Sequence, residues 1–65
     1  MRVYNEGWER GRQLGRERAI EDYRRVPQQA RAWAVQMFQR MAAVEEAWTR
    51  GYVAGYVKTV RAGGR

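Results

Sequence analysis

The chain has 65 residues, with 13 Lys or Arg against 7 Asp or Glu, and it contains no His, no Cys and no Ser. A chain of this length makes one small domain, whose own core leaves the free energy of folding close to zero. Because it has no residues for disulfides and lacks the usual ligands of structural zinc, we expect self-association or a partner to supply the missing stability.

The composition also argues against an enzyme. Hydroxyl groups are confined to Thr49, Thr59 and the four tyrosines. Without His or Cys, most pairings of a nucleophile with a base lack a member. Most carboxylates stand three or four residues from an arginine, a spacing typical of solvated ion pairs on a helix. We expect no catalytic residue, no cofactor and no metal.

The first residues, Met1 to Glu6, include two charged side chains and lack the hydrophobic stretch of a targeting segment. The longest uncharged run, Ala32 to Gln39, is far shorter than the about 20 residues that a spanning helix needs. We therefore expect a cytoplasmic protein with no transmembrane segment.

The first predicted helix covers about residues 3–24. Placed at 100° steps, its apolar and small residues form one narrow stripe of about 120°, made of Tyr4, Trp8, Gly11, Gly15, Ala19, Tyr23 and Val26. Each glycine inside a helix costs about 1 kcal/mol relative to alanine. This helix is therefore expected to need a surface to lie against.

The second predicted helix covers about residues 28–61 and follows a turn at about 25–27. Pro27 suits the first turn of a helix, and Gly63 and Gly64 supply a stop, with a flexible tail at 62–65. Its apolar stripe stays within about 100° for over seven turns and contains Ala30, Trp33, Ala34, Met37, Met41, Val44, Trp48, Gly51, Tyr52 and Gly55.

Two arrangements fit these helices. Either the chain reverses at 25–27 and forms an antiparallel hairpin, or Pro27 only kinks one long helix. The turn lacks the Gly, Asn or Asp that a tight connection favours. The hairpin, however, would place Gly15 opposite Phe38 and Gly11 opposite Ala42, so that small residues meet larger ones. We favour the all-α, two-helix antiparallel hairpin as a single domain over 1–65.

One pattern occurs twice. Trp8-x-Arg10-Gly11-x-x-x-Gly15 recurs forty residues later as Trp48-x-Arg50-Gly51-x-x-x-Gly55. It can be a duplicated helix-packing module, in which a tryptophan precedes a glycine groove. It can equally be a coincidence in a glycine-rich chain. We assign helix packing or an oligomer interface to Trp8, Gly11, Gly15, Trp33, Met37, Met41, Val44, Trp48, Gly51 and Gly55.

In the hairpin the longer helix would extend beyond its neighbour from about residue 51. This overhang is apolar around most of its circumference, which is unusual for a surface helix. It can be buried in a homodimer, dock a different protein, or lie on a membrane surface. We expect a partner-binding surface with an apolar centre and a basic rim, formed by Arg50, Tyr52, Val53, Tyr56, Val57, Lys58 and Arg61.

The net charge of +6 points to an acidic partner. Arginine outnumbers lysine twelve to one, and its guanidinium suits bidentate contacts with phosphate or carboxylate. Several arginines have an acidic neighbour one turn away, in the pairs Glu6/Arg10, Arg18/Asp22, Glu21/Arg25 and Glu46/Arg50. Arg12 and Arg16 form the clearest unpaired cluster and are the candidates for nucleic-acid binding. The arginine content can also reflect a GC-rich genome alone.

These observations favour a non-enzymatic, self-associating helical module that binds another protein, as an adaptor or inhibitor. The alternative is a small basic dimer that binds nucleic acid through arginine–phosphate contacts. In composition alone, this short, Cys-free, Arg-, Trp- and Ala-rich chain resembles accessory proteins encoded by bacteriophages and other mobile elements.

Overall fold

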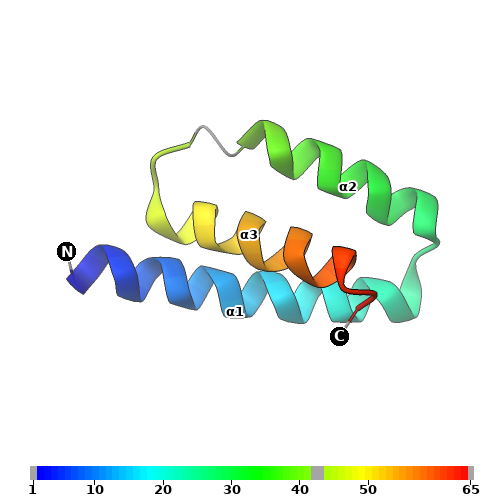
Figure 1. Ribbon diagram of the computed structural model, residues 1–65, viewed down its shortest axis with the longest axis horizontal. Coiled ribbons are helices and arrows are strands. Elements are labelled where there is room, and N and C mark those ends of the chain that lie inside the picture. The colour runs from blue at the N-terminus through cyan, green and yellow to red at the C-terminus, as the bar shows by residue number, and fades with distance from the viewer. Residues whose placement is uncertain (1, 42–43, 65) are drawn as a thin grey trace.

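The computed structural model describes residues 2–41 and 44–64, and these form three helices. They are α1 (Arg2–Arg25), α2 (Gln28–Arg40) and α3 (Ala47–Arg61). Helix α3 lies along α1, and α2 crosses the other side of α3 on the return path of the chain (Figure 1). The all-α class is confirmed, whereas the expected single helix over 28–61 is wrong because two helices occupy that range.

Helices α1 and α3 run parallel and make the closest packing of the fold (Figure 1). Their N-terminal ends meet where a Cβ on Gly7 would lie 3.6 Å from that of Ala47. Their C-terminal ends meet where the Tyr23 hydroxyl donates to the Val60 carbonyl, at 3.1 Å. The expectation that α1 forms an antiparallel hairpin with the helix that follows it is therefore wrong. Helix α2 does run antiparallel to α1, but it touches α1 only lightly.

The first reversal is at Val26 and Pro27, as the sequence predicts. The Val26 amide still donates to the Asp22 carbonyl, and Pro27 then adopts an extended conformation with ψ of 160°. The residue before a proline is disfavoured in the helical region, which favours ending α1 here. The Pro27 carbonyl accepts from the amides of Ala30 and Arg31 and so starts α2.

The second reversal, between Arg40 and Ala47, has no such signal. The stretch from Met41 to Glu46 contains neither glycine nor proline, and its middle residues, Ala42 and Ala43, lie outside the described part of the chain. The Thr49 hydroxyl donates to the Glu46 carboxylate at 2.8 Å where α3 begins. Tertiary packing overrides helix propensity here, because only a reversal lets α3 return along α1.

Helix α3 ends at Arg61, and the predicted glycine stop is confirmed. Gly63 and Gly64 both have φ of +82°, a conformation that favours glycine. Their amides donate to the Val60 and Thr59 carbonyls, which satisfies acceptors at the end of the helix.

The core is small and is built mainly from α3. Its buried apolar side chains are Ala19, Val53, Tyr56 and Val57, and Tyr56 is only 1% exposed. Phe38 covers this core from α2, with its ring 4.8 Å from that of Tyr56 in an edge-to-face arrangement. Helix α2 itself contains no buried residue. None of the described helices has both the length and the apolar composition that crossing a bilayer requires.

Candidate functional site: a basic-rimmed groove on α3

The repeated sequence pattern builds the α1–α3 contact. A Cβ on Gly11 would overlap the Trp48 carbonyl oxygen and lie 2.9 Å from its carbon. A Cβ on Gly51 would overlap the Trp8 carbonyl oxygen and lie 2.8 Å from its carbon. The two glycines thus make the same contact in opposite directions. The two repeats, which are forty residues apart in the sequence, therefore lie side by side in the α1–α3 contact.

The second glycine of each repeat behaves in the same way. A Cβ on Gly15 would lie 2.9 Å from the Tyr52 carbonyl carbon, and one on Gly55 would lie 2.9 Å from that of Arg12. Both values are shorter than real Cβ contacts, so no larger residue fits without moving a backbone. The helices therefore approach at backbone distance, as in parallel small-xxx-small pairs.

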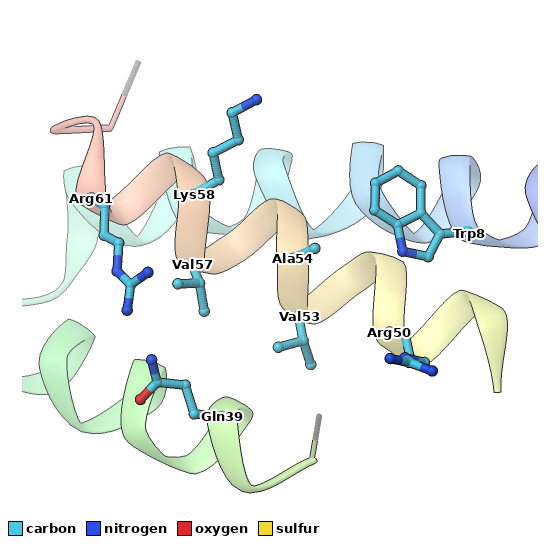
Figure 2. Close-up of a pocket in the computed structure, with 8 residues that line it drawn as sticks. All are labelled: Trp8, Gln39, Arg50, Val53, Ala54, Val57, Lys58 and Arg61. Atoms are coloured by element: carbon cyan, nitrogen blue, oxygen red, sulfur yellow. The ribbon is translucent and has the colours of Figure 1, made fainter. Parts of the chain in front are cut away.

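With its glycine face against α1, helix α3 presents its other side to a groove of about 510 Å³. Val53 and Val57 project towards α2 and form an apolar floor with Ala54 (Figure 2). Trp8 contributes from α1 and Gln39 from α2, so the groove draws on all three helices (Figure 2).

The charged residues that line the groove, within the described part of the chain, are all cations. They are Arg50, Lys58 and Arg61, and no carboxylate of the described residues lines it. All three are exposed, and among the described residues none of them forms an ion pair. In particular, Arg50 does not pair with Glu46, whose carboxylate accepts from Thr49 instead. The groove therefore combines an apolar floor with an uncompensated positive rim.

Five of the seven residues expected in a partner surface line this groove, and the two tyrosines do not. Tyr56 is buried, and its hydroxyl donates to the Asp22 carboxylate at 2.6 Å. Tyr52 is half-buried beside Trp48, with 5.2 Å between the ring centroids. The expectation of an uncovered overhang is wrong, because α1 and α2 both pack against this part of α3.

Arg12 and Arg16 lie beside a separate, smaller pocket of about 140 Å³, together with Lys58. The Arg12 guanidinium donates to the Glu9 carboxylate, with Nε at 3.0 Å. This hydrogen bond lowers the pKa of Glu9 and raises that of Arg12. The expectation that Arg12 is unpaired is therefore wrong. Its pocket adjoins the groove through the shared Lys58.

Two of the arginine pairs that the sequence predicts form within α1. Arg18 pairs with Asp22 at 3.0 Å and Arg25 with Glu21 at 3.3 Å. Both pairs lie on α1, as their one-turn spacing predicts.

The other residues assigned to an interface divide into two groups. The glycines Gly11, Gly15, Gly51 and Gly55 lie inside the chain's own α1–α3 contact. The large apolar side chains instead remain well exposed, at 64% for Trp33 and about 40% for Met37, Met41, Val44 and Trp48.

Sequence reasoning missed the groove residues Trp8, Gln39 and Ala54. Trp8 stands at the same position of its repeat as Trp48. The repeat was therefore the signal for its position, because it favours parallel pairing of the two segments. Gln39 had no such signal, because it reaches the groove only through the unpredicted reversal after α2. No known protein family, curated protein or solved structure matches the chain.

Proposed function

We propose that the protein is a non-enzymatic, self-associating helical interaction module of the cytoplasm, whose groove binds an acidic amphipathic segment of another protein. The observation that carries the proposal is the composition of the groove. Three exposed cations surround an apolar floor, and no acidic side chain lines it among residues 2–41 and 44–64.

The charge of the rim selects the kind of partner. A basic surface repels a basic partner and attracts an acidic one, so the rim favours specificity and fast association. Arg50 and Arg61 belong to the residue type enriched at binding hot spots, and Trp8 adds an aromatic surface at the groove. An acidic adaptor target or an acidic inhibited protein fits these features.

The floor selects the shape of the partner. Val53 and Val57 are one turn apart on α3 and form a short apolar ridge at the bottom of the groove, where 7% and 9% of their surface stays exposed. An amphipathic helix that carries apolar residues at positions i and i+4, with Glu or Asp beside them, matches this ridge and its rim. The bound segment would lie along α3, with its acidic side chains towards Arg50, Lys58 and Arg61.

Selection from a random library of short helical peptides tests the proposal. We expect the enriched peptides to combine apolar residues at helical spacing with a negative net charge. Fluorescence anisotropy should then show that Arg50→Glu and Arg61→Glu each weaken the binding of such a peptide by about tenfold, the equivalent of about 1.4 kcal/mol.

The sequence repeat provides a matched control. Arg10 has the same place in the first repeat that Arg50 has in the second, but it lies outside the groove. Arg10→Glu makes the same change in net charge and should leave peptide affinity nearly unchanged. Equal losses for Arg10→Glu and Arg50→Glu, or enrichment of basic peptides, would contradict groove binding.

Nucleic-acid binding is the second candidate, and the pocket shared by Arg12, Arg16 and Lys58 favours it. Side chains of this kind would contact phosphates and carry no sequence preference. If several phosphates are neutralised, affinity for random duplex DNA falls steeply with salt. Charge reversal at Arg16 would then abolish DNA binding, whereas a weak affinity with a shallow salt dependence would reject this candidate.

A further inference from the structure

The outer face of α2 lacks charge in a chain that is otherwise rich in it. Charged residues make up 31% of the sequence, yet Arg31 is the only one between Gln28 and Gln39. The Arg31 guanidinium stacks over the Tyr23 ring, 3.7 Å from its centroid, and Nη1 donates to the Val26 carbonyl at 2.7 Å. The charge of Arg31 is therefore turned inwards, towards α1.

The same face carries large apolar side chains. Phe38 lies on the inner side of α2, against Tyr52 and Tyr56. Trp33 and Met37, one turn apart, are 64% and 39% exposed. They belong to the longest apolar stripe of the sequence, which the fold leaves largely uncovered along α2. Aromatic residues and methionine without charge are the composition of the centre of a protein interface.

We infer that this face binds a second copy of the chain, through α2 helices that pack against each other across a two-fold axis. The inference specifies the self-association that forms part of the proposed function and rests on that part. It does not depend on what the groove binds.

The net charge of +6 selects the occupant. Two copies repel each other wherever their cationic surfaces meet, so contact is favoured at a face that has no free cation over residues 28–39. An acidic partner, in contrast, would gain no charge complementarity on α2 and would favour the basic groove. A second copy is thus the occupant that an uncharged apolar face suits best.

Charge also sets the orientation of the two helices. Arg40 is the first cation after this face and lies at the C-terminal end of α2. A parallel pair would bring the two Arg40 side chains together. An antiparallel pair separates them and places each near the uncharged Gln29 and Ala30 of the other copy. In this isologous contact Trp33 of each copy faces Met37 of the other.

Analytical ultracentrifugation of the full chain tests the inference. We expect a dimer at micromolar concentration, and we expect Trp33→Glu and Met37→Glu each to raise the Kd of the dimer by about tenfold or more. Leu14→Glu is the matched control, because the exposed fraction of Leu14 on α1, 38%, is almost the same as that of Met37. Circular dichroism of every variant establishes that the helices are retained.

A mixing experiment tests the orientation and does not depend on loss of binding. In the antiparallel arrangement, a heterodimer of the Met37→Glu and Trp33→Lys variants pairs the new glutamate with the new lysine. We expect the mixture to dimerise more tightly than either variant alone. A mixture that stays monomeric would overturn the antiparallel contact.

The remaining outcomes separate the two levels of the proposal. A wild-type chain that stays monomeric at high micromolar concentration would overturn both this inference and self-association. Capture of that monomer by anionic lipid vesicles through Trp33 would likewise overturn both. A dimer that persists in the Trp33→Glu and Met37→Glu variants would overturn the α2 contact and leave self-association standing. Equal dissociation by Leu14→Glu would also overturn the α2 contact.

Discussion

The Tyr56 hydroxyl donates a 2.6 Å hydrogen bond to the Asp22 carboxylate and thereby joins the middle of α3 to the end of α1. Asp22 also accepts from Arg18, at 3.0 Å. Burial, and then the hydrogen bond to Asp22, raise the pKa of Tyr56 far above its usual value. The buried hydroxyl thus stays protonated at pH values where an exposed tyrosine ionises.

This contact predicts a loss of stability in alkali. Tyr56 ionises near pH 10 in the unfolded chain and only at higher pH in the fold. Its contribution to the free energy of unfolding is therefore complete below about pH 10 and decreases as the pH rises above that value. In Tyr56→Phe we expect a loss of about 1–2 kcal/mol at pH 7 and a shallower alkaline decrease. Urea unfolding across this pH range measures both.

Tyr4→Phe is the control for that experiment. Tyr4 lies on α1, is 44% exposed and makes no hydrogen bond through its hydroxyl within the described residues. It should change the stability at pH 7 very little. If both phenylalanine variants behave alike, the hydrogen bond to Asp22 does not stabilise the fold.

An engineered disulfide is expected to report the parallel direction of α1 and α3. The Cβ positions of residues 7 and 47 are 3.6 Å apart, within the usual range for a disulfide. In the Cys-free background, Gly7→Cys with Ala47→Cys should oxidise readily and stabilise the fold by about 4 kcal/mol in the loop-entropy account. Gly7→Cys with Ala62→Cys joins opposite ends of the pair and should not close. Gel mobility with and without reductant decides between these results.

The contact of Arg31 with Tyr23 predicts that arginine and lysine are not equivalent at this position. Arg31→Lys keeps the charge but loses the planar guanidinium that stacks on the ring and reaches the Val26 carbonyl. We expect it to lower the free energy of unfolding by about 1 kcal/mol. Arg24→Lys, at an exposed position of α1, is the control and should have almost no effect in thermal melts.

Local signals in the sequence were sufficient for the ends of two helices. Pro27 and the Gly63-Gly64 pair act within a few residues of themselves, so their effect could be predicted without knowing the fold. The reversal between α2 and α3 could not, because residues 41–46 are compatible with a continuous helix. Only the energy gained when α3 packs on α1 explains it, and that gain involves residues forty positions apart.

The groove could be predicted in part, because helical periodicity is a local signal. Arg50, Val53, Val57, Lys58 and Arg61 share one side of a helix whatever that helix contacts, so periodicity was enough to group them. The inward position of Tyr56 depends on Asp22, and that of Tyr52 depends on α1 and α2. The expected antiparallel hairpin paired α1 with the wrong segment of the chain. The repeat of the tryptophan–glycine pattern was the sequence feature that favoured parallel pairing, since matching motifs meet in register only when their helices run in the same direction.

Gly→Ala variants of the second repeat are the sharpest test of the reciprocal glycine contact. In a two-helix hairpin Gly51 and Gly55 would lie on an uncovered overhang, and alanine would stabilise the helix by about 1 kcal/mol. In the parallel pair a Cβ at either position overlaps backbone atoms of α1. We therefore expect Gly51→Ala and Gly55→Ala each to cost about 2 kcal/mol or more.

Urea unfolding of these two variants beside Gly7→Ala is the decisive measurement. Gly7 lies on the same face of α1, but the nearest atom to its Cβ position is at 3.6 Å, an ordinary contact. We expect Gly7→Ala to gain about 0.5–1 kcal/mol, whereas Gly51→Ala and Gly55→Ala lose stability. A gain in all three variants would contradict the parallel pairing of the two repeats.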